Sequence, residues 1–274
     1  MTPVTAVAQV FDAMQQARNG APAFCTNFFP IQGRLQGWID HGELFAERCA
    51  GAVFFLRKDH EFWHLYFCAA DEPVLRRELA ALSCLKTEPV AIDLVGREGA
   101  LDNLLSLAEA AGFRRYSRLL RLARASQPGQ ADSSTGDAPA VCADQTDVPA
   151  ILELLESSFD RYADQLPMPY EIAVAVAARQ ILAIKCEGLL AALLFFETQG
   201  FTSTVRYWVV AERFRSQRLG AALMRHYFAS HPAVRRFILW VTAENENAVT
   251  KYRHYGYAPD GLIDHVLVNP MINS

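Results

Sequence analysis

The stretch Thr204–Met224 reads TVRYWVVAERFRSQRLGAALM and decides the fold of the second half of the chain. It begins as a strand, because most residues up to Val210 are of types that suit a pleated surface. A polar turn follows. From Leu219 onward apolar residues recur every three or four positions, which predicts a helix. The segment therefore combines a strand, a short basic turn and a helix.

The first turn of the predicted helix has the properties of an anion site. Gly220, Ala221 and Ala222 are small, so that a ligand can come close to the backbone. The free N–H groups at a helix start attract negative charge, and the positive end of the helix dipole adds to this. Arg215 and Arg218 bring further positive charge. The pattern indicates a phosphate site, although an ordinary capped helix with two solvated arginines would give the same segment.

A second stretch, NENAVTKYRHYGYAPDG, starts at Asn245 directly after an apolar strand pattern. Asn245, Ala248, Tyr252 and Gly256 are spaced by three, four and four residues, which places them along one face of a helix. We expect Asn245 to cap this helix and Gly256 to end it in a left-handed conformation. A capped helix with a tyrosine in the core would show the same spacing.

These two stretches together resemble the GNAT N-acetyltransferase superfamily, over about residues 141–269. The resemblance implies acetyl-CoA as the co-substrate, which donates its acyl group to an amine by direct attack. It also implies that the backbone of Val209 and Val210 pairs with the pantetheine arm of the coenzyme and that Asn245 hydrogen-bonds the same arm. Tyr252 stands in the position of the general acid, which protonates the leaving thiolate.

The pyrophosphate-binding turn that the resemblance implies fits this sequence in two registers. Residues 217–222 match Arg/Gln-x-x-Gly-x-Gly/Ala literally, whereas residues 215–220 suit the flanking sequence better but set Arg218 at the first glycine. In both registers the backbone from Arg218 to Ala222 faces the pyrophosphate. The residues implied for this turn are Arg215, Gln217, Arg218, Leu219, Gly220, Ala221 and Ala222.

The general base has no distinctive motif. Glu197 ends the strand pattern next to the central strand and is our first candidate. Asp264 and His265 on the last predicted strand are weaker candidates, Glu212 has the character of a solvated loop residue, and a chain of water molecules is a further option. The acceptor, a small-molecule or peptide amine, is expected to contact residues 159–170 and those after 256.

The first half repeats the order of elements of the second. At an offset of 144 positions, residues 109–123 lie over 253–267, with Gly112 on Gly256, whereas Leu101 and Ala108 fall on Asn245 and Tyr252. We therefore predict the α/β class, with a mixed sheet: two tandem GNAT-like domains, each a mostly antiparallel sheet flanked by helices. The predicted parts are a degenerate copy (1–124), a linker rich in Ser, Gly, Pro and Asp (125–140) and a catalytic domain (141–274). Three roles stay open for the first copy: bracing the second, shaping its acceptor pocket, or forming a homodimer.

Composition narrows the function classes. A net charge of −4 over 274 residues argues against a nucleic-acid partner, and no apolar run is long enough to predict a membrane span. The six scattered cysteines and the amino-terminal sequence predict a reduced, cytoplasmic protein, and the histidines at 41, 60 and 64 lack partners at metal-ligand spacing, so that no metal is expected. Two alternatives to an N-acetyltransferase stay open: a non-catalytic acyl-CoA-binding module and an aminoacyl-tRNA-using transferase.

Overall fold

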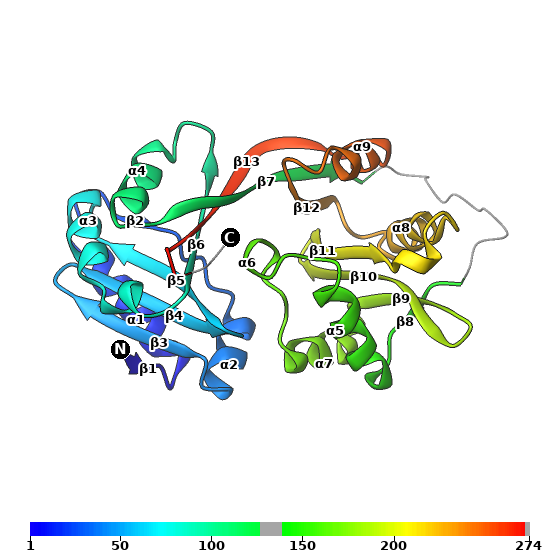
Figure 1. Ribbon diagram of the computed structural model, residues 1–274, viewed down its shortest axis with the longest axis horizontal. Helices are drawn as coiled ribbons and strands as arrows, with labels where there is room; N and C mark the ends of the chain where they lie inside the picture. Colours follow the sequence, from blue (N-terminus) through cyan, green and yellow to red (C-terminus); the bar gives the residue numbers. More distant parts are fainter. Residues whose placement is uncertain (127–138, 272–274) are drawn as a thin grey trace. The chain divides into compact units, whose positions relative to one another are not determined.

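The computed structural model describes residues 1–126 and 139–271, which divide into two compact units (Figure 1). Unit 1 comprises Met1–Leu119 together with Gly261–Ser274, and unit 2 comprises Leu120–Asp260. Most of the predicted linker, residues 127–138, lies outside the described residues. Each unit contains a mixed β-sheet flanked by helices, so the predicted fold class is confirmed.

The sheet of unit 1 has the strand order β1-β3-β4-β5-β6-β13. Its neighbours are antiparallel except β5 and β6, which run parallel and are joined through a helix. The short strand β2 pairs with the end of β5. The strands are β1 (Thr2–Pro3), β2 (Cys25–Thr26), β3 (Leu44–Cys49), β4 (Ala52–Asp59), β5 (Phe62–Ala69), β6 (Val90–Arg97) and β13 (Ala258–Val268), while the residues of β7 (Arg114–Ala125) are divided between the two units.

The second helix of unit 1 lies in an aromatic segment. It is nine residues long and buries Leu35 and Trp38 against the sheet. These two side chains are three residues apart, so they share one helical face. The helices are α1 (Val7–Arg18), α2 (Gln32–Asp40), α3 (Glu72–Ala81), the 3₁₀ turn η1 (Ser83–Lys86) and α4 (Asp102–Ala110).

The sheet of unit 2 has the order β7-β12-β11-β10-β9-β8. Strands β11 and β12 are parallel and are joined through helix α8, as β5 and β6 are joined through α3 in unit 1. The strands are β8 (Val141–Cys142), β9 (Ile181–Cys186), β10 (Leu189–Gln199), β11 (Thr202–Val210) and β12 (Arg236–Thr242). The helices are η2 (Gln145–Asp147), α5 (Val148–Glu156), α6 (Arg161–Asp164), α7 (Pro169–Ala177), η3 (Glu212–Phe214), α8 (Leu219–Ser230) and α9 (Glu246–His254).

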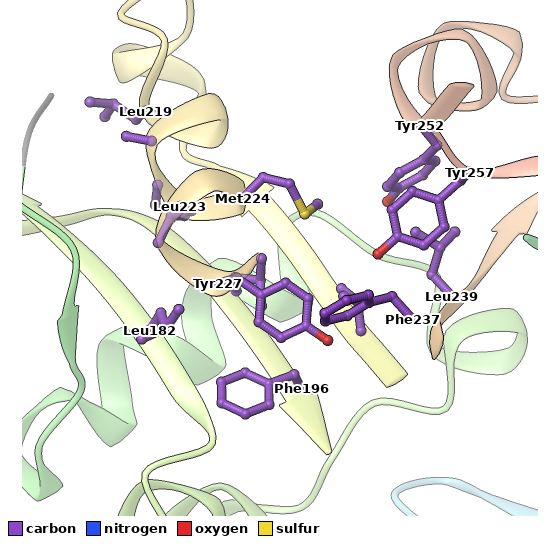
Figure 2. Close-up of a cluster of buried hydrophobic side chains, with 14 of the residues drawn as sticks. Leu182, Phe196, Leu219, Leu223, Met224, Tyr227, Phe237, Leu239, Tyr252 and Tyr257 are labelled. Carbon is purple, nitrogen blue, oxygen red and sulfur yellow. The ribbon is translucent and has the colours of Figure 1, made fainter. Parts of the chain in front are cut away.

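Helices cover both faces of the unit 2 sheet, which therefore has two hydrophobic layers (Figure 1). On one face α5 and α7 pack over a cluster that includes Phe195, Tyr207 and Val209. On the other face α8 packs over a cluster rich in tyrosine, phenylalanine and leucine (Figure 2). Because apolar side chains point to both faces, β9 and β10 read as nearly continuous apolar runs.

The last strand of the chain belongs mainly to unit 1. Residues Leu262–Val268 pair antiparallel with β6, and the next residue, Asn269, is fully buried. Its side chain accepts a hydrogen bond from the N–H of Val90 (3.0 Å) and donates to the carbonyls of Leu85 (3.1 Å) and Glu88 (2.7 Å). The compact units thus follow a different boundary from the sequence-based division at 124 and 141, which remains a prediction about the repeat.

The search for membrane spans covered only the described residues. None of their helices has both the length and the apolar character that crossing a bilayer requires.

Candidate functional site

Strands β11 and β12 pair only at their beginnings. Four pairs join them, from Thr202 with Arg236 to Val205 with Leu239, although β11 continues to Val210 and β12 to Thr242. The second half of β11 therefore has a backbone edge in mid-sheet that no strand within the described ranges covers. Unpaired backbone donors and acceptors at such a place favour an extended ligand that completes the ladder.

A β-bulge explains why the pairing stops there. On the other side of β11, Val205 is opposite Phe196 while Tyr207 is opposite Phe195, so Arg206 has no partner on β10. An extra residue bends a strand and increases its twist, which turns β11 away from β12 immediately after their last pair. Arg206 is held in this bulge by an ion pair with Glu197 (2.9 Å).

The start of α8 presents free backbone N–H groups. The first hydrogen bond of the helix runs from the N–H of Ala222 to the carbonyl of Arg218, so the N–H groups of Leu219, Gly220 and Ala221 precede it. Within residues 1–126 and 139–271 these three groups have no hydrogen-bond partner. Donors that converge at the positive end of a helix dipole favour the binding of an anion.

The turn before α8 is strained in a way that supports this function. Ser216 (φ 72°) and Arg218 (φ 59°) both adopt the left-handed conformation. A left-handed residue followed by a helical one directs successive N–H groups to the same side, which is a common anion-binding arrangement. Glycine adopts this conformation at the lowest cost, so the backbone favours the register in which Arg218 occupies the first glycine position and Arg215 leads the turn. The side chains of Arg215, Gln217 and Arg218 are exposed.

Helix α9 begins as the sequence predicted. The side-chain oxygen of Asn245 accepts a hydrogen bond from the N–H of Ala248 (3.1 Å), which confirms the expected cap. The N-cap role occupies only the oxygen, so the side-chain NH₂ group of this exposed residue is available to a ligand. The helix ends at His254, and Gly256, two residues further on, has a φ of 81°, which is the left-handed conformation that the sequence predicted.

Tyr252 points from α9 into the cluster beneath α8. The centre of its ring lies 5.5 Å from that of Trp208 and 6.0 Å from that of Tyr257. Figure 2 shows Tyr252 beside Tyr257. Burial raises the pKa of Tyr252, and the carboxylate of Asp164 raises this pKa further. The phenol therefore stays protonated at neutral pH, and its hydroxyl has no hydrogen-bond partner among the described residues. Both properties suit a proton donor.

The residues that the sequence offered as general base have different surroundings in the structure. Glu197 is next to the bulge, but the guanidinium of Arg206 already holds its carboxylate. Asp264 and His265 are on the part of β13 that pairs with β6 in unit 1, so they are not among the unit 2 residues that form this site. Glu212 is exposed and pairs with Arg215 at 3.5 Å, which agrees with a solvated loop residue.

In unit 1 the parallel strands β5 and β6 also stop pairing after their first residues, but there the side chain of Asn27 bonds to both strands. Strands β5 and β6 pair only at Trp63–Val90 and His64–Ala91. Beyond these pairs the side-chain NH₂ group of Asn27 donates to the carbonyl of Leu65 (3.1 Å) and to that of Asp93 (3.0 Å). The oxygen of the same amide accepts from the N–H of Phe67 (2.7 Å), and β2 continues the ladder along the end of β5.

Unit 1 also contains a buried charged cluster that sequence spacing did not reveal. His64, which is 1% exposed, lies 3.3 Å from a carboxylate oxygen of Asp59 and 3.9 Å from one of Asp93. Burial would raise the pKa of Asp59, but the hydrogen bond from His60 and the proximity of His64 and Arg57 outweigh burial and lower this pKa. The described residues contain no group of three or more potential ligands that could hold a metal ion.

Comparison with known proteins agrees with this geometry. The model of the acetyltransferase (GNAT) family matches residues 148–257, which include β11, α8 and α9. No curated protein matches the sequence.

Solved structures share the fold along almost the whole chain, at identities that support the fold alone. A tandem GNAT protein from the clavulanic acid biosynthesis pathway has a TM-score of 0.61 and 12% identity, and the match covers 100% of this chain and 98% of that one. A GCN5-related N-acetyltransferase from Sphaerobacter thermophilus has a TM-score of 0.58 and 16% identity (98% and 94% covered). One from Kribbella flavida has a TM-score of 0.57 and 17% identity (94% and 95% covered). Residues 148–257 therefore form a domain of the acetyltransferase (GNAT) family, and the chain as a whole shares the fold of a tandem GNAT protein.

Proposed function

We propose that this protein is an acetyl-CoA-dependent N-acetyltransferase whose single catalytic site is in unit 2. The observation that carries the proposal is the uncovered edge of β11, which ends at a turn with free N–H groups and faces a protonated tyrosine. Each feature matches a different part of an acyl-CoA: an extended amide-containing arm, a diphosphate and a thioester sulfur. The GNAT match supports the same co-substrate.

The residues present fit acetyl-CoA. The backbone of Val209 and Val210 is at the uncovered end of β11, where it would pair with the arm. The N–H groups of residues 219–221 would bind the diphosphate, with Arg215 and Arg218 screening its charge. The free NH₂ group of Asn245 would donate to the arm. When bound, the coenzyme supplies an activated acyl group.

Catalysis would rest on positioning and on proton transfer. A thioester is already reactive toward amines, so orientation of the amine against the carbonyl supplies much of the rate. The leaving sulfur gains from a proton, and Tyr252 is a buried phenol that retains its proton at neutral pH.

Two measurements test the proposal. Calorimetry with acetyl-CoA should give saturable binding with one coenzyme per chain, and a panel of primary amines should release free coenzyme A thiol in the presence of the protein. Binding without thiol release for any amine would favour a non-catalytic acyl-CoA-binding module. Binding of tRNA in place of acetyl-CoA would favour an aminoacyl-tRNA-using transferase.

A further inference from the structure

Asp164 occupies a fixed position beside the open part of β11. It is the last residue of α6, and its carbonyl accepts a hydrogen bond from the hydroxyl of Tyr207 (3.0 Å). The same hydroxyl donates to the carbonyl of Gln165 (2.7 Å). Tyr207 directly follows the bulge residue Arg206, so this contact attaches α6 to β11 where the pairing with β12 has just ended.

The turn around Asp164 is built to hold its carboxyl group in place. Asp160 caps the short helix by accepting from the N–H groups of Tyr162 and Ala163 (2.9 Å each). One carboxylate oxygen of Asp164 accepts from the N–H of Asp160 (2.9 Å). Gln165 then leaves the helix in a left-handed conformation, with φ at 48°. A non-glycine residue in this conformation stores strain, which is common at functional sites.

The carboxyl group of Asp164 differs from that of Glu197 in its surroundings. Within the described part of the chain Asp164 makes no ion pair, and its second oxygen has no hydrogen-bond partner. Burial raises the pKa of Asp164 to about 6; the N–H of Asp160 lowers this pKa, and the charge of Asp160 raises it. The group is thus ionised at neutral pH and can accept a proton.

Asp164 acts electrostatically on groups from both faces of the sheet. Its charge raises the pKa of Tyr207, which packs with α5 and α7, and also that of Tyr252, which packs with α8. A complete sheet would separate these faces. The titratable groups that interact electrostatically with Asp164 are Asp160 at the start of α6, Tyr207 on β11 and Tyr252 on α9.

We propose that Asp164 is the general base of the transfer reaction proposed above, on which this inference rests, and that it acts across the open strand pair from Tyr252. The carboxylate takes one proton from the acceptor's ammonium group. The freed nitrogen lone pair forms the C–N bond as the electron pair of the C–S bond leaves with sulfur. Tyr252 gives its proton to the thiolate, and the second proton on nitrogen passes to the tyrosinate, so the products are the amide, the thiol and one proton for solvent.

The test compares Asp164→Asn with Asp160→Asn. The first substitution keeps the side-chain oxygen that accepts from the N–H of residue 160, and the second keeps the oxygen that caps α6, so both variants should fold. Calorimetry with acetyl-CoA should show unchanged affinity in both. With the best amine of the panel, Asp164→Asn should lower kcat about 100-fold or more, as expected for a general base. Asp164→Asn should also abolish the fall in kcat that the wild type shows as pH drops through about 6. Asp160→Asn should keep this fall but move it to lower pH, because the negative charge that raises the pKa of Asp164 is removed.

A second readout needs no acceptor. In the carboxyl ¹³C NMR spectrum of the full chain, the resonance that disappears in Asp164→Asn should titrate near pH 6 and at lower pH in Asp160→Asn. Titration near the ordinary value of about 4, or full activity of Asp164→Asn, would overturn the proposal while leaving the N-acetyltransferase intact. Failure of the wild-type protein to bind acetyl-CoA would instead remove the proposed function.

Discussion

The indole of Trp208 packs directly on the backbone of Gly220. The indole N–H donates to the Gly220 carbonyl (3.2 Å), and a Cβ added at residue 220 would lie 3.1 Å from the ring. Glycine at this position therefore leaves room for the indole of Trp208 and also keeps the backbone at the start of α8 accessible to a ligand. Trp208 in turn contacts Tyr252, so one side chain links the anion site to the proposed acid.

Gly220→Ala should destabilise the protein. Alanine normally stabilises a helix relative to glycine, but here its methyl group must displace a rigid indole, and we expect a net loss of about 1 kcal/mol. In a Trp208→Phe background the smaller ring should remove the clash, so the same change should become neutral or stabilising. Denaturant unfolding of the four proteins gives both values, and equal costs in the two backgrounds would contradict the contact.

Asn245 has two separable roles, which two substitutions should resolve. Asn245→Ala removes the cap and should cost about 1 kcal/mol of stability. Asn245→Asp keeps the oxygen that accepts from Ala248 but loses the NH₂ donor, so its stability should equal that of the wild type. Both should bind acetyl-CoA more weakly by calorimetry. Unchanged affinity in Asn245→Asp would show that the amide does not contact the coenzyme.

Tyr252 and Tyr257 form a matched pair for testing the acid. Tyr252→Phe should lower kcat about 100-fold or more, with unchanged acetyl-CoA affinity, because only proton donation is lost. Tyr257 has a fully buried hydroxyl with no hydrogen-bond partner among the described residues. Tyr257→Phe should therefore leave kcat unchanged and stability equal or higher. Similar losses of kcat in both variants would indicate a packing effect.

These contacts show how far the sequence alone could lead. Local patterns predicted β11, the turn, α8, the cap at Asn245 and the left-handed end at Gly256, because each depends on residues close together in the chain. Spacing could not show which side chain meets Gly220, because Trp208 reaches it across the β11–α8 turn. It flagged residues 159–170 for acceptor contact but could not single out Asp164, whose environment depends on Tyr207.

The same limit applies to unit 1. The side chain of Asn27 donates hydrogen bonds to the carbonyls of Leu65 and Asp93, which are 38 and 66 residues away in the sequence. No local sequence pattern predicts contacts over such separations. The comparison at the offset of 144 positions predicted a degenerate copy, because Leu101 and Ala108 stand in the places of Asn245 and Tyr252. The structure adds that the Asn27 side chain supplies hydrogen bonds between β5 and β6, where unit 2 has an open strand pair.

Asn27→Ala should destabilise unit 1 strongly. It leaves two buried carbonyls and the N–H of Phe67 without partners, for an expected loss of about 2–4 kcal/mol. Asn27→Asp retains the acceptor for Phe67 but sets a carboxylate against two carbonyls, so its stability should be lower at pH 7 than at pH 4, relative to wild type. Chemical unfolding at the two pH values measures this, and a cost below about 0.5 kcal/mol for alanine would contradict the bridge.

Asp264 should make stability depend on pH. Burial raises the pKa of this carboxyl group, although the N–H of Leu94 lowers it in part. The folded state thus holds a proton that the unfolded state releases above its ordinary pKa of about 4, so the free energy of unfolding should fall as pH rises above that value. Asp264→Asn should lack this fall and be the more stable protein at neutral pH. Parallel pH profiles of the two proteins would contradict the assignment.

The most direct test of the central claim is a crystal structure of the protein with bound coenzyme A. The account predicts one coenzyme per chain, with its arm along residues 206–210 of β11, its diphosphate on the N–H groups of residues 219–221, and Asn27 still bridging β5 and β6. Coenzyme density between β5 and β6 with Asn27 displaced, or a diphosphate bound away from the start of α8, would contradict it.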